Sequence, residues 1–407
     1  MERVYARVTV SRKAEKSLRG GHPWVFGDEI RAIDRSYENG DLVDVLSEGG
    51  KYLGTGWIND HSKIRVRILS RNTNDRFDEA FFERRIRYAF AYRKTVMGKD
   101  FSACRLIFGE ADQFPGLTVD RFGDVLVVQM LSLGAERRKD MLFLLFLKVL
   151  SEMGESIRVI YERNDVAIRE LEGLRSYKDF YRLPGLLSET DGHTEICENG
   201  IFYDVDYING QKTGFFLDQK YNRRAVARLA PGMRVLDCFT HTGAFALNAA
   251  YAGAAHVTAV DVSAVALALA KKNAERNALA DRMSFLCADV FDLLAELEKR
   301  GEKPYDLIIL DPPAFTKSST TVQNAARGYK EINQRAMRLL PRGGYLATCS
   351  CSHFMTETLF RHMLHDAAAD AGVALRQIEA RQQSADHPIL WNVPETEYLK
   401  FYLFQVV

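Results

Sequence analysis

The second half of the sequence alternates short apolar runs with helical segments, and this alternation constrains the fold most. From about residue 220, β-rich runs such as MRVLDCF (233–239) and YDLIILDPP (305–313) are separated by helix-like runs such as AVALALAKKNAERNAL (264–279). Buried strands joined by helices are typical of a parallel, doubly wound sheet with helices on both faces. The sequence therefore predicts an α/β fold with a Rossmann-like sheet in this region.

A carboxylate follows each of four successive predicted strands: Asp237, Asp261, Asp289 and Asp311. Because the carboxyl ends of parallel strands meet at one edge of the sheet, where ligands bind in such folds, the four are expected to line one crevice. A single Asp in such a place is more often the cap of the next helix or turn. Four in this order, with Asp-Pro-Pro at the fourth, resemble the S-adenosylmethionine-binding arrangement of class I methyltransferases.

The turn after the first of these strands, DCFTHTGAF, lacks the glycine pattern of nicotinamide-binding folds. Its small residues still let backbone N–H groups approach a ligand at the start of a helix. No phosphate-binding GxxxxGK[ST] loop occurs in the chain. We therefore expect S-adenosylmethionine as the cofactor, with Asp261 at the ribose hydroxyls. The other expected cofactor-binding residues are Asp237, Phe239, Thr242, Gly243, Asp289, Asp311 and Gln219.

Two cysteines stand one residue apart at the end of a further apolar run, in TCSCS (348–352). Together, DCFTHTGAF, ILDPPAF and TCSCS resemble the bacterial rRNA 5-methylcytosine methyltransferases of the large-subunit type, which carry an N-terminal PUA domain. Three longer strings resemble the same family: RLIFGEADQFPGLTVDRFGD, NGQKTGFFLDQKYNR and ADHPILWNVPETEYLK. The resemblance implies that the substrate is a cytosine of 23S rRNA or of a large-subunit precursor.

Methylation of carbon 5 needs a cysteine, because this carbon is a poor nucleophile until a thiolate adds to carbon 6. The family's Ser-Cys-Ser pattern matches residues 350–352, so we favour Cys351 as the nucleophile over Cys349. Asp311 is expected to hold the polar edge of the cytosine near ring nitrogen 3. No cysteine follows the first proline of Pro312-Pro313, so a cysteine-assisted release is not assumed and the acceptor of the carbon-5 proton is unassigned.

Other roles for the two cysteines are weaker hypotheses. A metal site would use Cys349, Cys351 and His353 on one strand face, but zinc motifs more often space cysteines as CxxC, and no metal is predicted. A Cys349–Cys351 disulfide would lie at the upper geometric limit and would need an oxidising compartment. A buried structural thiol is the serious alternative. It is also what we expect of the remaining cysteines, Cys104, Cys197, Cys238 and Cys287.

The first half of the chain predicts two smaller domains. Residues 1–75 carry short β-like runs between glycine-rich turns, as in a small β-barrel, and the resemblance makes this a PUA-like RNA-binding domain. Residues 76–190 mix strands and helices in an α+β middle domain. Residues 191–407 form the predicted seven-stranded class I methyltransferase domain, with the final run, LKFYLFQVV, as an edge strand. A helix-period segment at residues 78–97 places Phe82, Ile86, Ala89 and Arg93 on one face.

RNA contact is predicted for the first domain, because it places cations near an aromatic residue: Arg12, Lys13, Lys16, Arg19 and Trp24. Cations neutralise phosphates, and aromatic rings stack on unpaired bases. Residues 1–100 hold 20 Lys and Arg against 15 Asp and Glu, an excess that permits RNA binding without demanding it. Neither a signal peptide nor a run of ~20 apolar residues is found, so we expect a cytoplasmic protein with no membrane partner. A homodimer is compatible with the sequence.

Other functions fit parts of the pattern. Asp-Pro-Pro also resembles the motif of methyltransferases that act on exocyclic base nitrogens, for which neither cysteine would be needed. A non-catalytic RNA-binding protein with a relic of this fold would bind no S-adenosylmethionine. A small-molecule methyltransferase is disfavoured by the large N-terminal portion.

Overall fold

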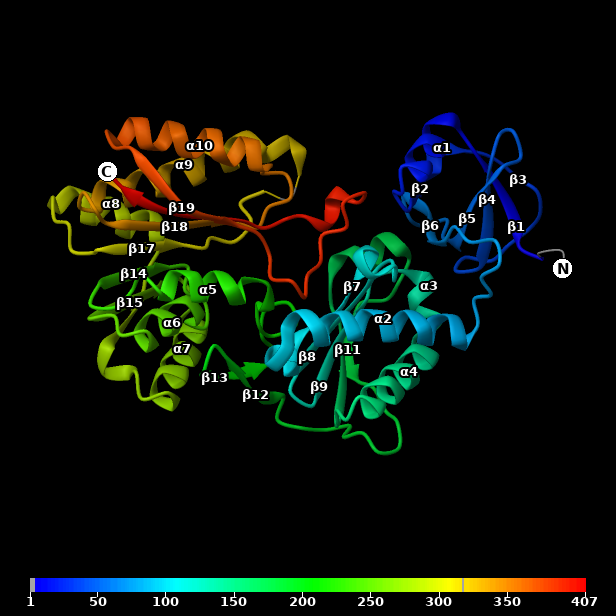
Figure 1. The fold of residues 1–407 in the computed structure, drawn as a ribbon, viewed down its shortest axis with the longest axis horizontal. Coiled ribbons are helices and arrows are strands. Elements are labelled where there is room, and N and C mark those ends of the chain that lie inside the picture. Colours follow the sequence, from blue (N-terminus) through cyan, green and yellow to red (C-terminus); the bar gives the residue numbers. More distant parts are fainter. Residues whose placement is uncertain (1–3, 317) are drawn as a thin grey trace. The chain divides into compact units, whose positions relative to one another are not determined.

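The computed structural model describes residues 4–316 and 318–407, and contacts divide the chain into two compact units (Figure 1). The first unit runs to Ile196 and also takes Val205–Leu217 and Ala385–Thr396. The second unit consists of Cys197–Asp204, Asp218–Ser384 and Glu397–Val407. Both predicted N-terminal domains thus fall in the first unit, and their limits at residues 75 and 190 stay predictions.

Six strands, one α-helix and a short 3-10 helix (Gly27–Glu29) form the described N-terminal part of the first unit: β1 (Ala6–Val10), α1 (Arg12–Arg19), β2 (Trp24–Phe26), β3 (Ile30–Ile33), β4 (Leu42–Ser47), β5 (Tyr52–Ile58) and β6 (Ile64–Ser70). The strands form one sheet in the order β2-β6-β5-β4-β1-β3. Apolar side chains that include Val8, Val45 and Val66 share its core. Helix α1 begins at Ser11, whose side chain accepts a hydrogen bond from the Ala14 N–H.

The rest of the first unit contains a five-stranded sheet in the order β11-β10-β9-β8-β7. The four residues predicted to share one face of α2, Phe82, Ile86, Ala89 and Arg93, are all buried. Asp112 pairs with the guanidinium of Arg93, which explains how a charged residue shares that face. The elements are α2 (Glu79–Met97), β7 (Ala103–Phe108), β8 (Leu117–Phe122), β9 (Val125–Met130), α3 (Leu133–Glu136), α4 (Lys139–Glu152), β10 (Val159–Asn164) and β11 (Tyr177–Phe180).

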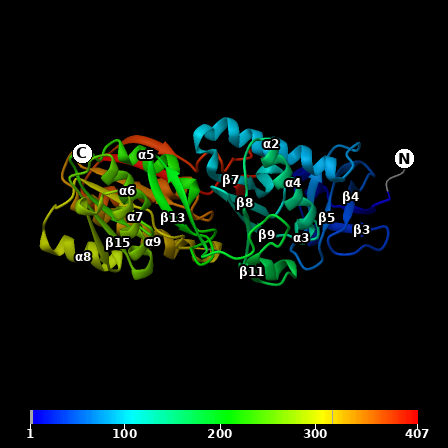
Figure 2. The same ribbon diagram turned by 90° about the horizontal axis from the view of Figure 1, so that it is seen from below.

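A hairpin of β12 (His193–Glu198) and β13 (Ile201–Asp206) leads the chain into the second unit, whose seven-stranded sheet has the order β16-β15-β14-β17-β18-β20-β19. Helices α8, α9 and α10 cover one face of this sheet, and α5, α6 and α7 cover the other (Figures 1 and 2). None of the described helices combines the length and the apolar character that a membrane span requires. The elements are α5 (Lys220–Ala227), β14 (Arg234–Cys238), α6 (Ala244–Tyr251), β15 (His256–Asp261), α7 (Ala264–Arg276), β16 (Met283–Cys287), α8 (Val290–Arg300), β17 (Leu307–Leu310), α9 (Val322–Leu339), β18 (Tyr345–Ser350), α10 (Glu357–Ala371), β19 (Leu375–Arg381) and β20 (Lys400–Val406).

The last strand does not lie at the edge of the sheet, so that prediction was wrong. β20 pairs antiparallel with β18 on one side and with β19 on the other, and β19 is the edge strand. The first five residues of β20, KFYLF, are all buried. An unbroken buried run is the pattern of an interior strand rather than of an edge.

Candidate active site

The carboxyl ends of the parallel strands of the second unit lie side by side. Cys238 at the end of β14 is in register with Val260 of β15 and with Leu310 of β17. Leu310 is in turn opposite Thr348 of β18. The predicted cofactor-binding carboxylates and both candidate nucleophiles therefore occupy the strand ends and turns along one edge, as expected for this type of sheet.

The turn between β14 and α6 has an unusual backbone. Phe239 and His241 adopt positive φ angles of 62° and 52°, a region that residues with a Cβ rarely occupy. Gly243 follows with φ 83° and precedes the first residue of α6. Thr242, between His241 and Gly243, is buried. Strained backbone of this kind is concentrated at ligand sites, where the surrounding structure holds it.

Asp237 is the most buried of the four predicted carboxylates, with 1% of its surface exposed. Its Oδ2 accepts hydrogen bonds from the Thr240 hydroxyl (2.5 Å) and the Ala246 N–H (2.9 Å). Its Oδ1 is equally buried but has no hydrogen-bond partner among the described residues. Burial raises the pKa of Asp237 to about 7, and the charges of Asp311 and Asp261 add to this effect. A buried oxygen without a donor is costly, so a bound ligand with an N–H group or a positive charge would fit here.

Asp261 and Asp289 end in more ordinary surroundings. The half-buried Asp261 accepts hydrogen bonds from the backbone N–H groups of His241 and Ser263, both at 2.9 Å. Asp289 is exposed and caps α8 by accepting from the Phe291 N–H at 2.7 Å. The hydrogen bonds of Asp289 are therefore those of an ordinary helix cap, the role that a single Asp most often has at such a position. Cofactor binding by both residues stays a prediction.

Asp311 follows β17 and is tied to a residue distant in the sequence. The Gln219 side-chain amide donates to Asp311 Oδ1 at 3.0 Å, and Asn222 donates to the Gln219 oxygen at 2.7 Å, which orients that amide. Burial raises the pKa of Asp311 to about 6, and the charge of Asp218 acts in the same direction. Gln219 thus holds Asp311 in place, and its predicted contact with the cofactor stays a prediction.

The structure separates the two cysteines of TCSCS. Cys349 lies within β18, is fully buried and is hydrogen-bonded to Asp311 and Gln219, and burial raises the pKa of its thiol far above the usual value. Cys351 comes after the last residue of β18 and is half-buried. The two residues and His353 thus do not share one strand face, and the residues that the structure describes include no group of three or more His, Cys, Asp or Glu side chains placed to hold a metal ion.

Both serines that flank Cys351 are buried and hydrogen-bonded. The Ser350 hydroxyl donates to the Tyr329 hydroxyl (3.1 Å), and the Ser352 hydroxyl donates to the Thr316 carbonyl (3.0 Å). Their anchoring fixes the backbone on either side of Cys351, which is itself half-buried. Of the remaining cysteines, Cys104 and Cys238 are buried as expected, whereas Cys197 and Cys287 are exposed because they lie on solvent-facing positions of their strands.

Lys400 is a residue of this edge that the sequence analysis did not single out. It is the first residue of β20, is buried to 7% exposure and lies opposite Ser350 of β18. Its ammonium donates to the carbonyl oxygens of Ser352 (2.6 Å) and Tyr398 (2.8 Å). The available signal was a lysine at the start of an otherwise apolar strand, LKFYLF.

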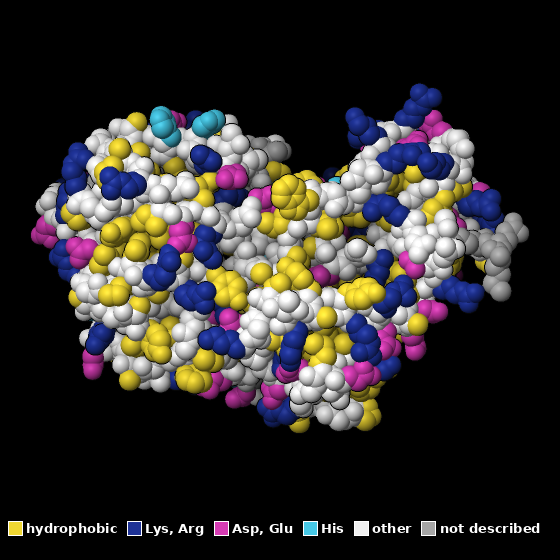
Figure 3. All heavy atoms as spheres, in the orientation of Figure 1, with side chains coloured by type: hydrophobic (Ala, Val, Ile, Leu, Met, Phe, Trp, Pro, Cys, Tyr) yellow, Lys and Arg dark blue, Asp and Glu magenta, His cyan; other side chains and the backbone are white. Residues whose placement is uncertain are grey.

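The predicted RNA-contacting cations lie on α1, in a part of the surface where Lys and Arg side chains gather (Figure 3). Lys16 is exposed. Trp24 is half-buried, and its indole N–H donates to Glu110 at 2.9 Å, so it fastens β2 to the segment after β7. The other three cations form ion pairs: Arg12 with Glu48, Lys13 with Glu29 and Arg19 with Glu15. RNA binding by these five residues stays a prediction.

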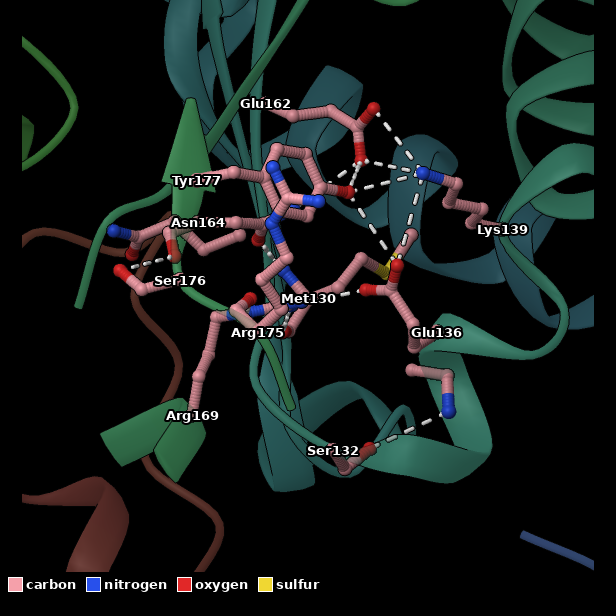
Figure 4. Close-up of polar contacts among 12 residues, drawn as sticks. Met130, Ser132, Glu136, Lys139, Glu162, Asn164, Arg169, Arg175, Ser176 and Tyr177 are labelled. Atoms are coloured by element: carbon pink, nitrogen blue, oxygen red, sulfur yellow. Dashed lines mark hydrogen bonds and ion pairs between the residues drawn. The ribbon is translucent and has the colours of Figure 1, made fainter. Parts of the chain in front are cut away.

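A dense group of polar side chains also lies in the first unit, contributed by α3, α4, β10 and β11 among other segments (Figure 4). Lys139 Nζ lies 3.1 Å from Glu162 and 3.0 Å from the Tyr177 hydroxyl, which donates to Glu162 at 2.6 Å. Burial and the hydrogen bond to Glu162 raise the pKa of Tyr177 to about 12. Arg169 adds an ion pair with Glu136 at 2.9 Å. Since these groups satisfy one another, we interpret the cluster as structural.

Two sequence families match the chain. Residues 180–404 match the family described as S-adenosylmethionine-dependent methyltransferase, and residues 8–71 match the family of PUA-like domains. Both families were predicted, so the expected fold class and the cofactor are confirmed.

Several relatives that match over nearly their full length carry the name ribosomal RNA large subunit methyltransferase I. The protein from Klebsiella pneumoniae (strain 342) is 38% identical over 406 residues, which cover 99% of both chains. The protein from Pseudoalteromonas translucida (strain TAC 125) is 42% identical over 390 residues, covering 95% of this chain and 96% of the relative. Among solved structures, a Streptococcus mutans protein described as a SAM-dependent methyltransferase matches with a TM-score of 0.81 at 24% identity, over 98% of this chain and 100% of that chain.

Proposed function

Since this chain belongs to the ribosomal RNA large subunit methyltransferase I family of S-adenosylmethionine-dependent enzymes, we propose that it methylates carbon 5 of a cytosine in 23S ribosomal RNA. The observation that carries this proposal is the position of Cys351, a half-buried residue between two anchored serines on the same sheet edge as Asp311. Methylation of an exocyclic base nitrogen would use the carboxylate of Asp311 but would not explain why a cysteine stands at this position.

The residues at the edge fit S-adenosylmethionine, which supplies an electrophilic methyl group. Asp237 offers a buried oxygen without a donor, suited to the ammonium or sulfonium charge. Asp261 keeps acceptor capacity for ribose hydroxyls beside the strained turn that contains Phe239 and Gly243. Asp289 completes the set of carboxylates along this edge.

The chain's own residues would carry the covalent steps. The Cys351 thiolate adds to carbon 6 of the cytosine, which makes carbon 5 nucleophilic toward the methyl group. Asp311, whose pKa is raised to about 6, can hold a proton for ring nitrogen 3 as the adduct forms. Loss of the carbon-5 proton and cleavage of the sulfur–carbon bond release the product. Cys349 is a poor candidate for the nucleophile, because burial strongly disfavours its thiolate.

Nucleoside analysis tests this function directly. Large-subunit RNA from cells without the protein is incubated with the purified chain and S-adenosylmethionine, and the digested RNA is analysed by mass spectrometry. We expect one new 5-methylcytidine. A nucleoside methylated on an exocyclic nitrogen would instead establish the alternative target. Absence of both methyl transfer and S-adenosylmethionine binding would establish a non-catalytic RNA-binding protein.

The raised pKa of Asp237 predicts that cofactor affinity depends on pH. Below pH 7 its carboxyl becomes protonated and loses attraction for a cationic ligand, so affinity for S-adenosylmethionine should fall roughly tenfold between pH 7 and pH 5.5. Calorimetry at the two pH values measures this change. Asp237→Asn should bind more weakly and show a flatter pH dependence, and an equal pH dependence in the variant would refute the assignment.

An exposed tryptophan extends the proposed RNA surface beyond α1. Trp391 is 97% exposed, although the segment around it is fixed. Asn392 donates from its side chain to the Gly21 carbonyl (2.5 Å), and His22 Nε2 lies 3.1 Å from Glu395. The indole is therefore presented on a segment fastened to the turn that follows α1. A large ring held in solvent beside a basic helix suits an unpaired base.

Trp391→Ala is expected to lower affinity for single-stranded large-subunit RNA about tenfold, since one stacked base contributes about 1–3 kcal/mol. Fluorescence anisotropy at one fixed salt concentration measures it. Tyr88→Ala is the matched control, because Tyr88 is also an exposed aromatic of the first unit, at 68%, but lies on α2. Equal affinity of the Trp391 and Tyr88 variants would contradict the role of Trp391.

A further inference from the structure

Lys400 lies beside the backbone of residues 350–352, which contain the proposed nucleophile Cys351. In the antiparallel pairing of β18 and β20, Lys400 lies directly opposite Ser350, so the two side chains are on the same face of the sheet. Its ammonium reaches the Ser352 carbonyl, two residues further along. Cys351 is the residue between Ser350 and Ser352, and the negative charge of its thiolate would raise the pKa of Lys400.

The environment of Lys400 favours exchange of a proton. Its ammonium contacts two backbone carbonyls, those of Ser352 and Tyr398. Burial lowers the pKa of Lys400 to about 8, while Cys351, Glu397 and Glu357 oppose that shift. A neutral amine keeps two N–H groups for the two carbonyls and has a lone pair left to accept a third proton. An aliphatic side chain would fill this space without the cost of burying an ammonium.

We propose that Lys400 accepts the thiol proton of Cys351 and holds its sulfur as a thiolate, and this inference rests on the proposed function. The S–H bond breaks, the proton forms an N–H bond at Nζ, and the electron pair stays on sulfur. The sulfur then forms its bond to carbon 6 and recovers the same electron pair when that bond breaks at release. Lys400 stays an ammonium throughout and acts only through Cys351, so it is a positioning residue. The acceptor of the carbon-5 proton is a separate group.

Alkylation of Cys351 tests the inference without RNA or cofactor. The rate of reaction with iodoacetamide is followed against pH by mass spectrometry of the peptide that contains Cys351, because Cys197 and Cys287 are exposed as well. The midpoint of the curve of alkylation rate against pH gives the apparent pKa of the Cys351 thiol. In the unmodified chain, this midpoint should lie clearly below the ordinary thiol pKa of about 8.5. A midpoint at or above this value would overturn the inference, whatever the behaviour of any variant.

Two variants separate charge from packing. Lys400→Met should raise the midpoint by at least about one pH unit, which lowers the alkylation rate near pH 7 about tenfold. Lys400→Arg keeps the positive charge and should stay within about half a unit of the unmodified chain. Lys303→Met is the matched control, because Lys303 also donates to a backbone carbonyl (Leu340, 2.9 Å) but precedes the opposite, amino end of β17. Equal midpoints for the Met variants at 400 and 303 would overturn the inference.

A second measurement distinguishes this inference from the proposed function. RNA containing 5-fluorocytidine should be trapped on the unmodified chain as a stable adduct, because fluorine at carbon 5 prevents release. A lowered thiol midpoint without an adduct would refute the cytosine mechanism and leave the thiolate pair of Cys351 and Lys400 intact. An adduct formed by a thiol with an ordinary midpoint would refute Lys400 alone.

Discussion

Replacing Cys351 by Ala is expected to lower the rate of methyl transfer at least about 10³-fold, because the variant lacks the sulfur that must add to carbon 6. The fold should be retained, since Cys351 is only half-buried and lies after the last residue of β18. Binding of S-adenosylmethionine, measured by calorimetry, should change little by comparison. The readout is the initial rate of methyl incorporation into unmethylated large-subunit RNA.

Cys349→Ala is the matched comparison. This variant loses a buried thiol that is hydrogen-bonded to Asp311 and Gln219, so a reduced rate within about tenfold of the unmodified chain is expected. With RNA containing 5-fluorocytidine, the Cys349 variant should still form the covalent adduct and the Cys351 variant should not. If both variants, and the double variant, methylate RNA at similar rates, no covalent cysteine is involved and the exocyclic-nitrogen reaction becomes the better explanation.

Local sequence patterns predicted helices and strands well where the spacing of apolar residues along the chain determines which side chains pack together. The period of about 3.6 residues placed Phe82, Ile86 and Ala89 on one helix face, and the structure buries all three. The parallel core of the second unit followed from apolar runs that alternate with helices. The place of β20 was missed because its hydrogen-bond partners are set by tertiary pairing, although its unbroken apolar run was a signal for an interior strand.

The sequence predicted which edge of the sheet forms the site, but it did not predict the contacts within the site. The carboxylates could be identified from their positions after predicted strands, because the topology brings the ends of parallel strands together. The hydrogen bond between Gln219 and Asp311 joins residues 92 positions apart in the chain, and no spacing rule indicates it. The separation of Cys349 from Cys351 depends on where β18 ends, and strand limits are the least predictable feature of a sequence. Lys400 went unnoticed because one lysine in an apolar run also fits a strand that simply starts at the surface.

Asp311→Asn is expected to lower kcat about 10²–10³-fold, the usual contribution of a positioned general acid. Burial, with the charge of Asp218, raises the pKa of Asp311 to about 6, so the carboxyl still carries a proton in part of the working pH range. The asparagine cannot release a proton to ring nitrogen 3. In the unmodified chain the protonated form is the active one, so this contribution to kcat should be present below pH 6 and lost as the pH rises through 6. The pH profile of kcat for Asp311→Asn should therefore lack this descending limb near pH 6.

Gln219→Leu is the matched variant: it should shift the pH dependence of kcat, whereas Asp311→Asn should abolish it. The Gln219 amide donates to Asp311 Oδ1 and favours its ionised form, which lowers the pKa of Asp311. Without this donor the carboxyl should keep its proton to a higher pH, so the limb should move upward instead of disappearing. Profiles of kcat between pH 5 and pH 9, recorded for the unmodified chain and both variants, give the comparison. A limb that persists in Asp311→Asn, or that moves downward in Gln219→Leu, would assign the titration to another group and would leave Asp311 as a hydrogen-bond acceptor only.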